Sequence, residues 1–171
     1  MQALSSCYGR LLDAMIVLAC ALLFGMTILI GADVLLRNAG AGGVAPSNEL
    51  SEDILYLITL LAAPALLRQG AHIRVDIILQ MLPPTAAWLL EWIGDIIGTV
   101  CCLYFVWYGA QMTLASIAAD ALSIKTLVTP EWWILVPMPV AFALLTVEFI
   151  FRMHRLTQSE RRPRDDAVSA S

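Results

Sequence analysis

The chain has 171 residues, of which 60% are hydrophobic and only 14% are charged, with a formal net charge of −4 and a mean hydropathy of +0.79. In soluble domains, roughly a quarter of all residues are charged. The composition therefore excludes an ordinary soluble domain. We predict an all-α integral membrane protein and no nucleic-acid partner. Residues 1–156 are expected to form one four-helix membrane domain, and residues 157–171 a charged, disordered cytoplasmic tail.

The first predicted span covers about residues 11–36. Its uncharged run, residues 14–32, would reach about 28 Å as a helix, close to the roughly 30 Å of a bilayer's hydrocarbon core. Asp33 and Arg37 follow with i,i+4 spacing, which allows them to pair at the end of the span. The length of this run and the two charges favour a retained membrane helix over a cleaved signal peptide.

The second predicted span covers about residues 49–67 and begins with three acids. Its uncharged run, residues 54–67, is only about 21 Å long, so the helix must start near Glu49. That start brings Glu49, Glu52 and Asp53, which share one helical face, to the bilayer edge. We expect Arg37 to pair with Glu49 or Asp53 and to offset their desolvation.

A polar hinge, residues 68–76, follows the second span. Its polar and turn-forming residues are Arg68, Gly70, His72, Arg74 and Asp76. Burying these charges in lipid would cost several kcal/mol each, so the hinge must lie at a water interface. We expect it to organise the turn without touching substrate, with His72 donating to the last carbonyls of the second helix. Residues 75–82 are too short to span and are expected to form a short helix in the interface.

The third predicted span covers about residues 86–118. Trp88 and Trp92 near its start are typical of an interfacial aromatic belt. Because residues 96–118 are uncharged and long enough to span, we interpret Glu91 and Asp95 as a water-exposed helix end. Gly94 and Gly98 form a small-x-x-x-small pattern that offers a close helix-packing surface.

The fourth predicted span covers about residues 130–151. The sequence Thr129-Pro130-Glu131 is typical of a helix start, with a capping residue, a proline at the first position and an acid next. By the same reasoning, Ser47 or Asn48 is expected to cap the second helix.

The basic residues are distributed unequally between the two sides of the predicted spans. Four spans place both termini on one side, together with eight of the ten Lys and Arg residues: Arg10, Arg68, Arg74, Arg152, Arg155, Arg161, Arg162 and Arg164. The other side holds Arg37 and Lys125. The positive-inside rule therefore predicts that both termini and the polar hinge are cytoplasmic.

The pattern from about Asp33 to Leu82 resembles the small membrane subunit of tripartite ATP-independent periplasmic (TRAP) transporters, the DctQ family. The resemblance rests on Asp33-Val34-Leu35-Leu36-Arg37, on Glu49 at the start of the second span, and on the polar hinge with its sequence His72-Ile73-Arg74-Val75-Asp76. The hinge is the most specific part, whereas the C-terminal half matches only in its architecture.

The resemblance implies a role that the residues alone would not reveal. Such a subunit resides in a bacterial inner membrane and scaffolds a large transport subunit, and a periplasmic binding protein delivers the substrate. Uptake of a small organic acid is driven by a sodium or proton gradient. The resemblance implies no enzymatic activity and no cofactor.

Two other classes of protein compete with this interpretation. A self-sufficient four-span transporter would use a carboxylate near the middle of a span, and a membrane enzyme would need paired cysteines or buried histidines. The acids lie at the predicted span ends, both histidines lie near an interface, and Cys7, Cys20, Cys101 and Cys102 form no C-x-x-C pair. These features favour the accessory transport subunit.

Overall fold

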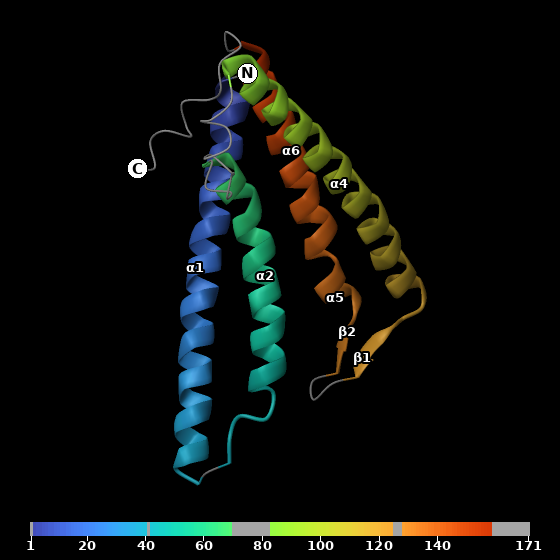
Figure 1. Ribbon diagram of the computed structural model, residues 1–171. Coiled ribbons are helices and arrows are strands. Elements are labelled where there is room, and N and C mark those ends of the chain that lie inside the picture. Colours follow the sequence, from blue (N-terminus) through green and yellow to red (C-terminus); the bar gives the residue numbers. More distant parts are fainter. Residues whose placement is uncertain (1, 41, 70–82, 125–127, 159–171) are drawn as a thin grey trace.

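The computed structural model describes residues 2–40, 42–69, 83–124 and 128–158. Its helices are α1 (Gln2–Asn38), α2 (Ser47–Arg68), α4 (Pro84–Ala118), α5 (Trp132–Leu135) and α6 (Pro137–Gln158), and its two short strands are β1 (Leu122–Ile124) and β2 (Val128–Pro130) (Figure 1). The hinge residues from Gly70 onward and the interfacial helix expected at residues 75–82 lie outside the described residues.

Four of the helical segments are long and apolar enough to cross a membrane: Tyr8–Asn38, Ser47–Arg68, Thr85–Ala118 and Trp132–Thr157. Many large apolar side chains on these helices are exposed, such as Phe24 at 69% and Leu35 at 71%. An apolar surface of this kind is stable in lipid and would aggregate in water. The chain is therefore a multi-pass membrane protein with four spans, which confirms the predicted fold class.

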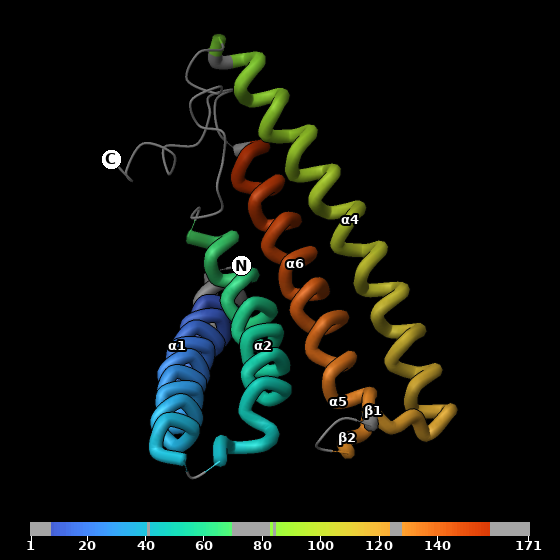
Figure 2. The backbone as a smooth tube through the Cα atoms, turned by 60° about the horizontal axis from the view of Figure 1, so that its bottom comes forward, coloured from blue at the N-terminus to red at the C-terminus, as the bar shows by residue number. Residues whose placement is uncertain are grey.

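The helices are arranged as two pairs. Helix α1 packs along α2, α4 packs along α6, and α2 joins the pairs by packing against α6. The starts of α1 and α4 and the ends of α2 and α6 lie at one end of the molecule, which we call the hinge end (Figures 1 and 2). The opposite end carries the segment between α1 and α2 and the β1–β2 hairpin, and we call it the loop end.

The two pairs meet through a small apolar core. Leu67 from α2, Cys102 from α4 and Leu145 from α6 are all at least 92% buried, and Phe149 packs against them. Gly98 permits this approach, because a Cβ atom there would lie 2.5 Å from Cζ of Phe149, whereas a Cβ atom at Gly94 would meet nothing within 4 Å. Only one glycine of the predicted pair therefore serves close packing.

The segment between α4 and α6 is more structured than the sequence suggested. Strands β1 and β2 pair antiparallel, with Leu122 opposite Pro130, and the helical backbone resumes at Trp132. The predicted helix start at Thr129-Pro130-Glu131 is therefore wrong, because Thr129 and Pro130 belong to β2. The predicted capping of α2 is wrong too: Pro46 is the N-cap residue, without a side-chain hydrogen bond, and Ser47 is already helical.

Two helices extend beyond their predicted bounds at the hinge end. Helix α1 begins at Gln2 instead of near residue 11, and the hydroxyl of Tyr8 donates to the carbonyl oxygen of Leu144 at 2.9 Å. Helix α6 continues to Gln158 instead of ending near residue 151, and Leu156 in this extension is fully buried. Contacts with neighbouring helices therefore stabilise the additional helical turns at the start of α1 and the end of α6, which the sequence analysis had placed outside the spans because they are polar.

Candidate functional site

Charged side chains from three helices gather at the hinge end. They form what we call the hinge-end cluster: Arg68 on α2, Glu91 and Asp95 on α4, and Glu148, Arg152 and Arg155 on α6. Glu91, Asp95, Glu148 and Arg152 are at least 91% buried. Ionisable groups buried near a membrane need partners or they would be neutralised. The partners of these groups decide what the cluster can do.

Glu148 is the most deeply buried acid of the hinge-end cluster. Its side chain is only 2% exposed, and its Oε1 accepts a hydrogen bond from Nη2 of Arg155 at 2.6 Å. The two residues lie seven positions apart on α6, so two helical turns bring them to the same face. Arg155 is half exposed, so its guanidinium connects the buried carboxylate to the aqueous side. This contact neutralises a charge that would otherwise be costly inside the bundle.

Asp95 and Arg152 link the facing surfaces of α4 and α6. Nη2 of Arg152 lies 3.4 Å from Oδ1 of Asp95, and both side chains are at least 92% buried. Glu91, one turn earlier on α4, is 9% exposed. The interpretation of Glu91 and Asp95 as a water-exposed helix end is therefore wrong, because α6 covers this face of α4 and supplies a cation that the sequence assigned to the tail.

Tyr8 and Arg68 bring the other helix pair to the hinge-end cluster. The guanidinium carbon of Arg68 lies 5.6 Å from the ring centroid of Tyr8, within the range of a cation–π contact. Gly9 leaves room for this guanidinium, because a Cβ atom there would lie 3.1 Å from Nη2 of Arg68. The ring of Tyr8 also lies 5.8 Å from that of Phe151 on α6. Residues of α1, α2 and α6 therefore meet beside the charged groups.

The hinge-end cluster contains three cations and three acids, so its formal charges balance. The Asp95–Arg152 pair connects two helices, and the Glu148–Arg155 pair connects a buried carboxylate to a half-exposed guanidinium. Such an arrangement is typical of a structural network. In the described part of the chain, no group of three or more His, Cys, Asp or Glu residues is placed to hold a metal ion. The geometry is therefore better suited to stabilising the packing of the helix ends than to binding a cation.

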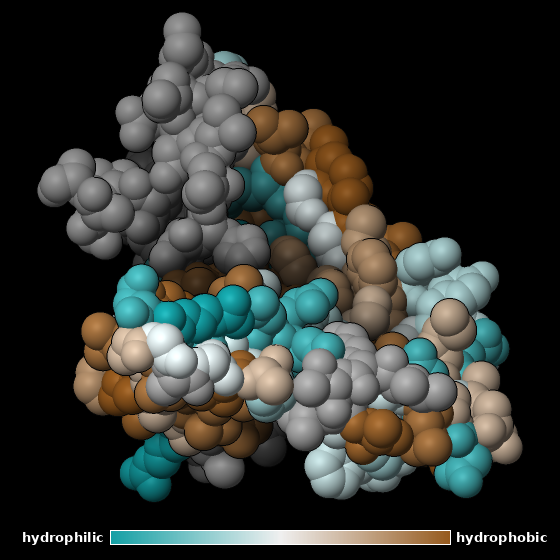
Figure 3. Space-filling view, turned by 90° about the horizontal axis from the view of Figure 1, so that it is seen from below, coloured by the Kyte–Doolittle hydropathy of each residue, from teal (hydrophilic) through white to brown (hydrophobic). Residues whose placement is uncertain are grey.

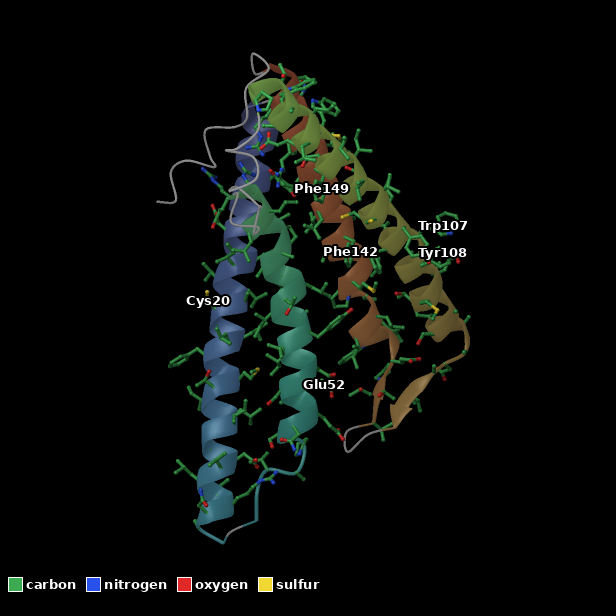
Figure 4. All side chains as sticks on the ribbon, in the orientation of Figure 1. Cys20, Glu52, Trp107, Tyr108, Phe142 and Phe149 are labelled. Atoms are coloured by element: carbon green, nitrogen blue, oxygen red, sulfur yellow. The ribbon has the colours of Figure 1, made fainter. Side chains whose placement is uncertain are left out.

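A groove lies at the loop end between α2 and the hairpin. Its cavity has a volume of about 290 Å³ and is lined by Glu52, Asp53, Tyr56, Ser123, Glu131, Ile134 and Leu135. Glu52 lies on the side of α2 that faces α5 (Figure 4), and Figure 3 looks onto this end and shows hydrophilic surface beside apolar helix faces. Glu131 accepts a hydrogen bond from Ser116 Oγ at 3.2 Å. The groove therefore presents carboxylates to the outside of the bundle.

Asp33 fastens the segment between α1 and α2. Its Oδ2 lies 2.9 Å from Nε of Arg37, and its Oδ1 accepts a hydrogen bond from the backbone N–H of Val44 at 2.6 Å. In the described residues, Arg37 thus pairs within its own helix, and the expected pairing with Glu49 or Asp53 is wrong. The i,i+4 spacing had allowed the observed pair, and the end of α1 extends past the start of α2 (Figure 1).

The structure brings together only some of the residues predicted from the sequence. Asp33 and Arg37 contact each other, Glu52 and Asp53 line one groove, Glu49 lies in the first turn of α2, and Arg68 joins the hinge-end cluster. The expectations for Gly70, His72, Arg74 and Asp76 concern residues outside the described part. Sequence reasoning missed Glu148 and the burial of Arg152. The available signal was the i,i+4 spacing of Glu148 and Arg152 in a mostly apolar helix, with Arg155 seven positions after Glu148 on the same face.

Comparison with known proteins gives two similarities. Residues 26–159 match the family described as Tripartite ATP-independent periplasmic transporters, DctQ component. A Haemophilus influenzae protein, named provisionally as a TRAP transporter small permease protein, is 26% identical over 108 residues, which cover 61% of this chain and 67% of that protein. The family match includes α2, α4, α6 and the last third of α1, so it extends over both helix pairs.

Proposed function

The chain belongs to the DctQ component family of tripartite ATP-independent periplasmic transporters, and from this premise we propose that it scaffolds a large transport subunit. In this proposal the assembled complex takes up a small organic acid, which a periplasmic binding protein delivers. An ion gradient drives the uptake. The chain itself holds the transport subunit in place and carries out no chemical step.

The distribution of charge supports a scaffolding role. The charged residues of the four described spans gather at the hinge end and the loop end. Beside the hinge-end cluster, the two helix pairs meet through Leu67, Cys102 and Leu145. The described side chains that form this core are apolar, so desolvating an organic anion among them would be costly. This apolar contact between the pairs is the observation that carries the proposal.

The orientation is part of the same proposal. Arg68, Arg152 and Arg155 lie at the hinge end, whereas Arg37 lies at the loop end. Together with the eight-to-two distribution of Lys and Arg in the whole sequence, this bias supports a cytoplasmic hinge end in a bacterial inner membrane. The loop-end groove would then face the periplasm, where the binding protein docks.

Reconstitution tests the proposal directly. Proteoliposomes with this chain alone should show no uptake of an organic acid under a sodium or proton gradient. Proteoliposomes that also contain the large membrane component and receive the binding protein should show uptake. Omission of this chain should reduce that uptake, because the large component would lack its support. Uptake by this chain alone would contradict the proposal and favour a self-sufficient transporter that uses a membrane carboxylate.

A further inference from the structure

The α1–α2 pair is joined to the α4–α6 pair by the hinge-end turns of α1 and α2. Leu67, in the last turn of α2, packs in the apolar core with Leu145 of α6. Tyr8, in the second turn of α1, donates a hydrogen bond to the carbonyl oxygen of Leu144, and its ring lies 5.8 Å from that of Phe151. These contacts hold the α1–α2 pair to α6 near one end of its length.

At the loop end, each pair is fastened within itself. The backbone N–H of Val44 donates to Oδ1 of Asp33 at 2.6 Å, which holds the segment after α1 to that helix. In the other pair, Oγ of Ser116 on α4 donates to Oε2 of Glu131 at 3.2 Å, and the backbone N–H of Glu131 donates to the carbonyl oxygen of Ala121 at 3.1 Å. The hairpin and α5 are therefore attached to the α4–α6 pair.

Two adjoining cavities lie between the pairs at the loop end. The groove cavity of about 290 Å³ and a second cavity of about 160 Å³ share Asp53, Tyr56 and Ile134 among their lining residues. The second cavity extends to Leu57 on α2 and to Pro137 on α6. Side chains that line a cavity lack the close contacts that hold two surfaces together, and regions with few packed contacts open most readily. The connection between the pairs is therefore weaker here than at the hinge end.

Helix α2 bends most easily beside the apolar core. Pro64 lies inside this helix and is buried. It has no N–H group to donate to the carbonyl oxygen of Leu60, and such a missing hydrogen bond allows a helix to bend. Ala63 and Leu67, on either side of the proline, pack in this core. The longer part of α2 can therefore tilt while its last turn stays in place, and α1, which packs along α2, can tilt with it.

We propose that the two helix pairs pivot about their hinge-end contacts, so that the loop-end groove widens and narrows. Glu52 on α2 and Glu131 next to α5 lie on opposite walls of the groove, so this motion changes the separation of their carboxylates. Collective motions of this kind take microseconds to milliseconds. The inference concerns a property of this chain and goes beyond the proposed function, on which it does not depend.

Pulsed electron–electron resonance between spin labels measures the motion directly. The four native cysteines are replaced by alanine, and the full chain is labelled in lipid nanodiscs at exposed positions of α1 and α4. One variant carries labels at Leu35 and Leu114 toward the loop end, and the other at Leu11 and Leu89 toward the hinge end. The loop-end distance distribution should be at least about twofold wider than the hinge-end distribution. Equal widths would show a rigid body and overturn the proposal.

A control within one pair separates pivoting from local flexibility of α1. Labels at Leu35 and at Leu50, an exposed position on α2, report the same end of α1 against its own partner helix. This distribution should be as narrow as the one at the hinge end. If it is as wide as that between Leu35 and Leu114, the end of α1 moves by itself and the pivot is wrong. Each labelled variant should keep the helical circular dichroism of the wild type.

Restoring the missing hydrogen-bond donor tests the bend in α2. Pro64→Ala supplies an N–H group for the carbonyl oxygen of Leu60 and should narrow the distribution between Leu35 and Leu114, because the helix becomes stiffer. The hinge-end distribution should stay unchanged. An unaltered loop-end width would contradict a pivot that depends on bending at Pro64. Since the large component is absent from these samples, failure of the pivot leaves the scaffolding proposal standing, and failure of the uptake experiment leaves the pivot standing.

Discussion

Asp95 and Arg152 show how a charged pair can be stable within an otherwise apolar bundle. Each side chain is at least 92% buried, and the two lie on different helices. Taking both ions out of water costs several kcal/mol each, which their mutual attraction recovers only while both are present. The pair therefore joins α4 to α6 conditionally, and removal of one partner leaves the other as an uncompensated charge.

Neutralising one member of this pair should be more harmful than neutralising both. We expect Asp95→Asn and Arg152→Met each to lower the free energy of unfolding by about 3 kcal/mol. The double variant should lose less than either single variant, because it leaves no uncompensated charge. Unfolding by sodium dodecyl sulfate titrated into mild detergent measures these changes. Asp120→Asn, at an exposed acid with a φ of +47° that asparagine adopts readily, should be neutral. Additive losses would contradict the coupling.

Gly43 gives a second prediction for a single residue. A Cβ atom there would lie 2.5 Å from Oδ1 of Asp33 and 2.6 Å from Nε of Arg37. The half-exposed Arg37 could move aside, but Asp33 is buried and holds the backbone N–H of Val44. We expect Gly43→Ala to lower the unfolding free energy by about 1 kcal/mol. In Gly31→Ala, where the new Cβ meets nothing within 4 Å, the same titration should show no loss.

At the scale of helices, the contact between α4 and α6 depends on a small number of close approaches. Gly98 lies against Phe149, the ring of Phe105 stacks on Phe142 at 4.7 Å, and Gly109 lies against Pro139. Without a strong hydrophobic force between helices in lipid, such packing is a main source of their association. The pair α4–α6 should therefore respond strongly to added volume along this seam.

Gly98 and Gly94 provide a matched pair for this expectation. Gly98→Ala would place a methyl group 2.5 Å from the ring of Phe149, and this overpacking should cost about 1–3 kcal/mol. Gly94→Ala meets open space and should be neutral or slightly stabilising, because alanine favours a helix. Thermal unfolding of both variants in the same detergent tests the difference. Equal behaviour would show that the close approach at Gly98 is not limiting.

The sequence predicted the four membrane helices better than the contacts that their side chains make. Uncharged runs of sufficient length gave four spans close to those observed, because hydrocarbon thickness dictates helix length. The same runs could not reveal that Arg152 turns into the bundle, since its partner Asp95 lies 57 positions earlier and only packing brings the two together. The hairpin after α4 was missed because three-residue strands leave too short a pattern to recognise.

At the scale of the whole molecule, the four helices form two pairs that meet near the hinge end and leave a groove at the loop end. The hinge end holds the arginines of the hinge-end cluster, of which Arg152 is buried, whereas carboxylates line the groove at the loop end. A bundle with this polarity has two chemically distinct ends. Its direction in the membrane therefore decides which partner each end can meet.

We expect the hinge end, and with it both termini, to lie in the cytoplasm. Four spans bring the start of α1 and the end of α6 to the same side (Figure 1). Of the ten Lys and Arg residues, eight lie on that side in the sequence, and basic residues near span ends are retained in the cytoplasm. A reporter that is active only in the cytoplasm should therefore be active when fused after Ser171. The same reporter should be inactive when it is inserted at Gly42.

The reverse reporter controls for differences in expression. A fusion that is active only in the periplasm should give the opposite pattern at the same two positions. Weakening the charge bias gives a further test, because substitution of Arg161, Arg162 and Arg164 by glutamine lowers the cytoplasmic count from eight to five against two. We expect the orientation to survive this change, since five still exceeds two. A periplasmic signal from the wild-type fusion at Ser171 would contradict the orientation and would place the carboxylate-lined groove in the cytoplasm.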